Sequence, residues 1–170
     1  MQKRAWGPFW TNASPSGNKQ AMRLESDESL VALLSSVARI ALVGASPKPD
    51  RPSHSVMRFL LEEGFEVIPV NPALAGQTLL GLPVYASLAE VPGTIDMADV
   101  FRDSQFLPDI TQALIELGIP ALWTQLGVTH SQAEQAALAA GINLVIDRCP
   151  AIEVPRLRDL GLLPARPLHQ

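Results

Sequence analysis

The sequence has few of the features that mark secreted, membrane or nucleic-acid-binding proteins. Its single cysteine, Cys149, excludes an internal disulfide framework. The formal net charge is −4 at pH 7, so there is no basic face of the kind that binds nucleic acid. No apolar run approaches the roughly 20 residues of a membrane span, and the start of the chain lacks the apolar region of a secretory signal. These absences predict a cytoplasmic protein with no nucleic-acid and no membrane partner.

What is present suits one domain of ordinary size. The chain has 170 residues, of which 47% are hydrophobic, enough to bury a sizeable core. Residues 1–26 are rich in glycine, proline and small polar residues and predict a flexible N-terminal arm. We expect the domain to span 27–160, with a C-terminal tail over 161–170. Four leucines near the C-terminus are candidates for a homodimer contact: Leu157, Leu160, Leu162 and Leu163.

Short apolar runs alternate with stretches of helical periodicity from residue 27 onward. Strands are predicted at 39–43, 66–70, 97–101, 121–124 and 143–146. Helices are predicted at 53–63, 107–117 and 131–140, with others after Ser26 and Cys149 and a short one at 87–90. This alternation is typical of βαβ units. It predicts a single-domain α/β protein with a Rossmann-like, doubly wound, five-stranded parallel sheet, and we expect strand order 3-2-1-4-5 in chain numbering.

The turn after the first strand carries the strongest binding signal. In open parallel sheets, ligands lie beyond the carboxyl ends of the strands. Gly44 there permits a tight turn, and the helix that follows presents N–H groups and a positive dipole end to a pyrophosphate. Ser46 adds a hydroxyl, and Lys48 and Arg51 bring positive charge to the same loop. This loop is therefore a candidate phosphate site.

The same loop departs from the glycine pattern of dinucleotide-binding proteins. That pattern would place glycines at positions 44, 46 and 49, where this chain has Gly44, Ser46 and Pro49. The second strand ends in Asn71 and Pro72, with no carboxylate to accept from the hydroxyls of an adenosine ribose. An uncharged end tolerates a phosphorylated ribose, so these residues disfavour NAD and are compatible with coenzyme A. No Gly-Lys-[Ser/Thr] follows the turn, so it is not a P-loop.

Five motifs, in order, resemble the small stand-alone CoA-binding domain proteins, and the same arrangement is similar to the CoA-binding domain of the succinyl-CoA synthetase α-subunit. They are LVGAS (42–46), PVNPALAG (69–76), ADVFR (98–102), LWTQLGV (122–128) and DRCP (147–150). The resemblance covers roughly 27–158 and implies a Rossmann-like domain that holds coenzyme A or an acyl-CoA. It implies these contact residues: Gly44, Ala45 and Ser46 at the pyrophosphate; Asn71 and Pro72 at the adenosine; Val100, Phe101, Arg102, Gln125 and Gly127 along the cofactor.

No catalytic constellation stands out, so we expect no catalytic residue and no metal site. The chain lacks the second domain that carries the phosphorylated histidine of succinyl-CoA synthetase. The leading hypothesis is a non-catalytic carrier, sensor or regulator that binds coenzyme A. Two alternatives stay open: an enzyme acting on the CoA thiol or on thioesters through Cys149, and a sensor of a nicotinamide or another nucleotide. His54 is either a ligand contact or a solvated or capping residue.

Overall fold

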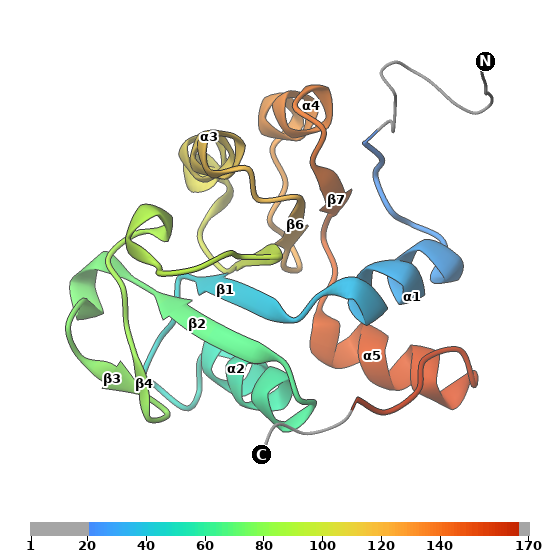
Figure 1. Cartoon of the computed structure of the whole chain (residues 1–170), viewed down its shortest axis with the longest axis horizontal. Helices are drawn as coiled ribbons and strands as arrows, with labels where there is room; N and C mark the ends of the chain where they lie inside the picture. Colours follow the sequence, from blue (N-terminus) through green and yellow to red (C-terminus); the bar gives the residue numbers. More distant parts are fainter. Residues whose placement is uncertain (1–20, 167–170) are drawn as a thin grey trace.

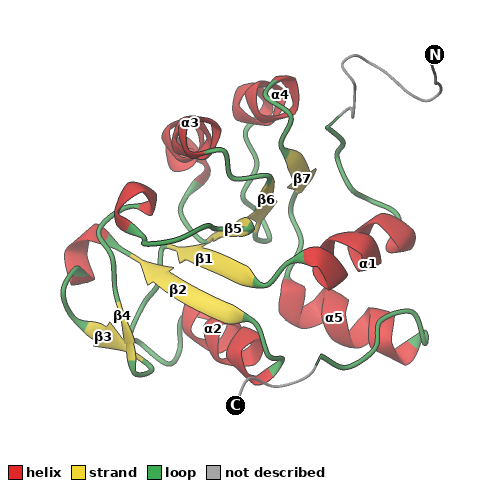
Figure 2. Ribbon diagram, viewed as in Figure 1, coloured by secondary structure: helices red, strands yellow, loops and turns green. Residues whose placement is uncertain are grey.

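The computed structural model describes residues 21–166 and confirms a single α/β domain (Figure 1). Its centre is a five-stranded sheet in which every neighbouring pair is parallel. The strands are short and almost wholly buried, because helices cover both faces (Figure 2). Their bounds are β1 (Arg39–Val43), β2 (Glu66–Val70), β5 (Met97–Val100), β6 (Ala121–Thr124) and β7 (Asn143–Val145).

The helices divide the core into two layers. One face packs against α1 (Asp27–Ser36), α2 (Pro52–Glu62) and α5 (Pro150–Asp159), and the other against α3 (Leu107–Leu117) and α4 (Ser131–Ala139). Side chains alternate between the layers along each strand. Leu42, Met97 and Trp123 therefore lie in the first layer, whereas Val43 and Val100 lie in the second.

The strand order differs from our expectation. It is β2-β1-β5-β6-β7, which is 2-1-3-4-5 for the five sheet strands in chain order, so the predicted 3-2-1-4-5 was wrong. The outer edge of β2 is already occupied where it ends. The N–H of Tyr85 donates to the carbonyl of Pro69 (3.1 Å), and the N–H of Asn71 donates to the carbonyl of Tyr85 (2.9 Å). The next sheet strand therefore pairs with the free side of β1.

The segment between β2 and β5 contains no α-helix. It holds the 3₁₀ turns Pro72–Leu74 and Leu88–Glu90 and a two-stranded antiparallel hairpin of β3 (Thr78–Leu79) and β4 (Leu82–Pro83). The short helix predicted at 87–90 is the second of these turns. A further 3₁₀ turn, Ser104–Phe106, leads into α3. The hairpin had no signal that we recognised in the sequence, because its strands are only two residues long.

Both ends of the described chain pack on the domain. Residues 22–24, which we assigned to the flexible arm, instead pair with β7: Leu24 N–H donates to Leu144, whose own N–H donates to Met22. In the expected C-terminal tail, Arg166 lies over the ring of Phe65. Residues 1–20 and 167–170 lie outside the described residues. Of the four leucines proposed for a dimer contact, Leu157 and Leu163 are buried in the core and Leu160 and Leu162 are exposed.

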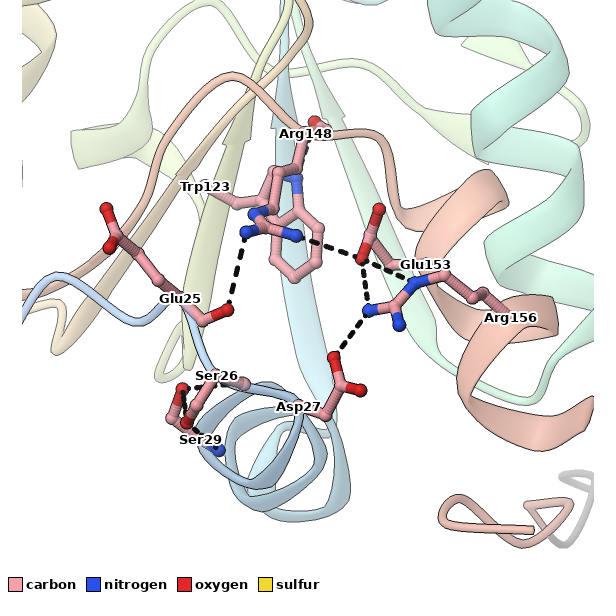
Figure 3. A network of polar contacts seen from close by, with 8 residues as sticks. All are labelled: Glu25, Ser26, Asp27, Ser29, Trp123, Arg148, Glu153 and Arg156. Carbon is pink, nitrogen blue, oxygen red and sulfur yellow. Dashed lines mark hydrogen bonds and ion pairs between the residues drawn. The ribbon is translucent and has the colours of Figure 1, made fainter. Parts of the chain in front are cut away.

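A polar network fixes α5 against α1 (Figure 3). Glu153 Oε1 accepts from Arg148 Nη1 (3.2 Å) and Arg156 Nη2 (2.8 Å), and the same Arg156 nitrogen donates to Asp27 (2.8 Å). The hydrogen bond from Arg156 lowers the pKa of the Asp27 carboxyl. Ser26 caps α1 as predicted, its hydroxyl accepting from the N–H of Ser29 (3.1 Å). Among the described residues, no helix is long and apolar enough to cross a membrane.

Candidate functional site

The turn after β1 requires glycine at position 44. Gly44 has φ +94°, a left-handed conformation that residues with a Cβ adopt only at a cost. A Cβ there would also lie 3.2 Å from the carbonyl carbon of Phe101 and 3.1 Å from Cδ of Arg102. The turn is therefore packed directly against the end of β5, and both the backbone and the neighbours exclude a larger residue.

The amides expected to face a pyrophosphate are used inside the fold. The N–H groups of Gly44 (2.9 Å) and Ala45 (3.4 Å) both donate to the carbonyl of Val70. The carbonyl of Ala45 accepts from Asn71 Nδ2 over 2.7 Å, so Asn71 ties the turn to the end of β2. These two N–H groups are therefore not free to bind a phosphate. Any phosphate contact from this loop begins at Ser46.

Positive charge gathers where α2 begins. The α2 N-terminus has Arg51 at its cap position with no side-chain cap and Pro52 in its first turn. The side chains of Lys48 and Arg51 are exposed, and Ser46 is half-buried with its hydroxyl accepting from the N–H of Lys48 (3.2 Å). The exposed carboxylate of Asp50 lies between Lys48 and Arg51 in the chain, so the loop carries two positive charges and one negative charge. The positive end of the α2 dipole adds to this small positive excess. The assignment of Ser46, Lys48 and Arg51 to a phosphate site stays a prediction.

The residues at the end of β5 differ in how far they are buried. Val100 is fully buried in the layer that contacts α3 and α4, so its side chain is not available to a ligand, contrary to our expectation. Phe101 is half-buried at the edge of the opposite layer. The guanidinium of Arg102 lies 4.0 Å from the ring centre of Phe106, which holds the cation beside the glycine turn.

A buried polar pair lies at the end of β6. Gln125 Nε2 donates to Asp99 Oδ1 over 2.6 Å, and both side chains are buried. Asp99 Oδ2 is sealed from solvent with no partner. Burial raises the pKa of the Asp99 carboxyl to about 7, against the smaller opposing effect of the Gln125 hydrogen bond. Asp99 is thus a carboxyl whose charge is poorly stabilised by the fold.

The loop after Gln125 is held by an aspartate in an unusual conformation. Gly127 N–H donates to Asp147 Oδ1 over 2.6 Å, and Asp147 itself has φ +61°. A Cβ on Gly127 would meet nothing within 4 Å, so its φ of +81° rather than a close approach favours glycine. Asp147 and Arg148 thus tie loops together, since Arg148 also donates to Glu153 and to the carbonyl of Glu25.

Cys149 lies at the start of α5, half-buried, and lines a cavity of about 350 Å³ with Asp147, Arg148 and Glu153. Burial is the largest influence on its thiol and raises the pKa, and the charges of Asp99 and Glu153 act in the same direction. Among residues 21–166, no group of three or more His, Cys, Asp or Glu side chains is placed to hold a metal ion.

The structure changes the interpretation of His54 and Asp99. His54 in α2 is buried, so it is not the solvated residue considered from the sequence. Asp99 was considered only as one of several acids around its strand. Its signal in the sequence was its position: it is the one charged residue inside the apolar run Met97–Phe101.

The fold and the glycine turn place the protein in the class of Rossmann-like domains. Its candidate ligand site is the C-terminal edge of the parallel sheet. The chain belongs to the CoA binding domain family, whose pattern matches residues 38–155. It is similar to the uncharacterized protein YneT of Bacillus subtilis, with 36% identity over 75% of this chain and 93% of YneT. It is also similar to the α subunit of acetate–CoA ligase [ADP-forming] I of Pyrococcus furiosus, with 32% identity over 47% of this chain but only 18% of that subunit.

Solved structures agree with this assignment. A hypothetical protein from Pyrococcus horikoshii OT3 is 35% identical, with a TM-score of 0.76 over 79% of this chain and 93% of that one. A protein from Thermus thermophilus is 40% identical, with a TM-score of 0.75 over 78% of this chain and 99% of its own. Both cover nearly the whole of their own chains, so the fold occurs as a small stand-alone protein.

Proposed function

We propose that the protein binds coenzyme A or an acyl-CoA at the C-terminal edge of its sheet, as a non-catalytic carrier, sensor or regulator. The observation that carries the proposal is the glycine turn after β1, which is packed against Phe101 and Arg102 and is followed by the exposed Lys48 and Arg51 at the start of α2. Such a site favours a polyphosphate. Membership of the CoA binding domain family supports CoA as the source of that phosphate.

The end of β2 supports CoA over a nicotinamide cofactor. Asn71 and Pro72 stand there, and neither side chain is charged. A carboxylate at this place accepts hydrogen bonds from the ribose hydroxyls of NAD, and it repels a ribose phosphate. An amide allows the 3′-phosphate of CoA, for which the exposed Lys48 and Arg51 are available cations.

The chemistry of Cys149 supports a binding role over catalysis. A nucleophilic cysteine acts as the thiolate, which nearby positive charge normally stabilises. Here burial and two carboxylates raise the pKa of the Cys149 thiol, so the thiolate is scarce at neutral pH. An enzyme acting on CoA through this residue is the alternative that we consider less well supported.

Calorimetric titration of the full chain with CoA, acetyl-CoA, NADH and ATP tests the proposal. We expect heat of binding with CoA or acetyl-CoA and a much weaker response to NADH and ATP. Binding of CoA weaker than about millimolar, roughly 4 kcal/mol, would refute it. Equal affinity for NADH would favour the nucleotide-sensor alternative.

A further inference from the structure

The buried pair of Asp99 and Gln125 has a geometry that packing alone does not explain. Asp99 lies within β5 between Leu42 of β1 and Trp123 of β6, and it has no solvent exposure. The only hydrogen bond of its side chain within residues 21–166 is the one from Gln125 Nε2, and Oδ2 has no partner there. Burying a carboxyl with an unpaired oxygen costs free energy that an apolar residue would not incur.

The pair fixes which end of the Gln125 amide points outward. Above about pH 7 the Asp99 carboxyl is ionised and only accepts hydrogen bonds, so it then selects the NH₂ end of the amide for the inward position, as found for Gln125 Nε2. Oε1 must then lie on the side away from Asp99. Within the described part of the chain, Oε1 accepts no hydrogen bond, and it is not among the unpartnered side-chain atoms that are sealed from solvent. Gln125 directly follows β6, so this free acceptor lies at the carboxyl edge of the sheet.

The strand order indicates which part of the ligand reaches Gln125. In the proposed function, the loop from Ser46 to the start of α2 binds the pyrophosphate and the end of β2 lies beside the adenosine. β5 and β6 lie on the other side of β1 from β2. The remaining part of CoA, the uncharged pantetheine arm, therefore extends over β5 and β6. That arm carries amide N–H donors, which match an oxygen acceptor.

We propose that Asp99 is a positioning residue that orients the Gln125 amide so that Oε1 accepts a hydrogen bond from the pantetheine arm of CoA. This inference rests on the proposed function. It adds a residue that does not touch the ligand, and it assigns the β6 end to the arm rather than to the phosphates. Orientation by a buried partner matters because an amide that rotates freely presents a donor as readily as an acceptor.

The test compares two ligands and two substitutions in the full chain by calorimetry. The ligands are CoA and adenosine 3′,5′-bisphosphate, which lacks the arm. Asp99→Leu removes the acceptor, and Asp99→Asn keeps a carbonyl oxygen for Gln125 Nε2. We expect Asp99→Leu to weaken CoA binding about 3- to 10-fold, the worth of one hydrogen bond, and to leave the bisphosphate unaffected. Asp99→Asn can offer Gln125 either a carbonyl oxygen or an NH₂ group, so it should weaken CoA binding less than Asp99→Leu does.

A second background separates positioning from a general structural effect. In Gln125→Ala, adding Asp99→Leu should cause no further loss of CoA affinity, because the amide that Asp99 orients is gone. The side-chain amide of Gln125 gives a direct signature in ¹⁵N–¹H spectra. Its protons should exchange slowly in the parent and in Asp99→Asn, and quickly in Asp99→Leu. Asp99→Leu is expected to fold, since leucine has a similar size and removes the unpartnered Asp99 Oδ2, although Gln125 Nε2 loses its acceptor.

The outcomes distinguish the two proposals. If the parent binds neither CoA nor the bisphosphate, the proposed function fails and this inference fails with it. If the parent binds CoA but Asp99→Leu weakens both ligands equally, or weakens neither, the proposed function stands and the role of Asp99 is refuted. Additive losses for Asp99→Leu and Gln125→Ala would refute it as well.

Discussion

Asn71 Nδ2 donates to the carbonyl of Ala45 over 2.7 Å, and this bond joins the end of β2 to the glycine turn after β1. Asn71 Oδ1 accepts from the N–H of Ala73 (2.9 Å), so one side chain caps a 3₁₀ turn and holds the candidate phosphate loop. The residue that distinguishes this edge from a nicotinamide site is thus also a structural tie. Its two roles can be separated by substitution.

Asn71→Asp keeps the acceptor for Ala73, removes the donor to Ala45 and adds a charge. We expect CoA affinity to fall more than the affinity for 3′-dephospho-CoA, because the new carboxylate repels the 3′-phosphate. Asn71→Ser, which has no charge, is the control and should affect the two ligands equally. Titration of both variants with both ligands measures this. Equal losses in Asn71→Asp would place the 3′-phosphate away from β2.

Gly44→Ala should destabilise the fold by about 1–3 kcal/mol, through its positive φ and the contact with Phe101 and Arg102. Gly141→Ala is the matched control, because Gly141 has φ +88° and a Cβ there would meet nothing within 4 Å. Urea unfolding of both variants isolates the packing part of the cost. A loss in Gly44→Ala no larger than in Gly141→Ala would show that the turn is not closed against β5.

The raised pKa of Asp99 predicts that the free energy of unfolding decreases as the pH rises toward 7. Its pKa is raised from 3.8 to about 7 in the folded protein, so the folded state binds the proton more tightly than the unfolded chain. This stabilising contribution is complete below about pH 4 and is lost as the pH rises to about 7, amounting to about 4 kcal/mol. The difference between parent and Asp99→Asn in the free energy of unfolding should follow this curve. A constant difference from pH 4 to 8 would contradict it.

Cys149 should react slowly with iodoacetamide at pH 7, relative to a free thiol of ordinary pKa, because burial raises its pKa. The rate should increase as the pH rises past 9, where the thiolate forms. Mass spectrometry of the intact protein follows the reaction at the chain's single cysteine, and N-acetylcysteine in the same tube is the reference. Modification faster than the reference at pH 7 would revive the enzyme alternative.

Much of the fold could be predicted, because apolar runs buried on both faces and glycine-ended helices are local signals. The strand order could not, since the competition of Tyr85 for the outer edge of β2 is a long-range contact that no local pattern carries. At the site, Gly44 and Asn71 were predictable because a turn residue and a strand end have fixed positions. Val100 was wrongly expected to line the ligand site. It is buried in the core, because side chains at the end of a strand alternate between the two faces of the sheet. The pairing of Asp99 with Gln125 joins two strands and was invisible in the sequence.

The central claim, that the edge of the sheet binds coenzyme A, is tested most directly by competition. The full chain is mixed with CoA and NADH at equal concentrations in excess, and native mass spectrometry identifies what remains bound. We predict a mass increase of one CoA per chain and no NADH complex. A complex with NADH, or no complex with CoA, would contradict the account.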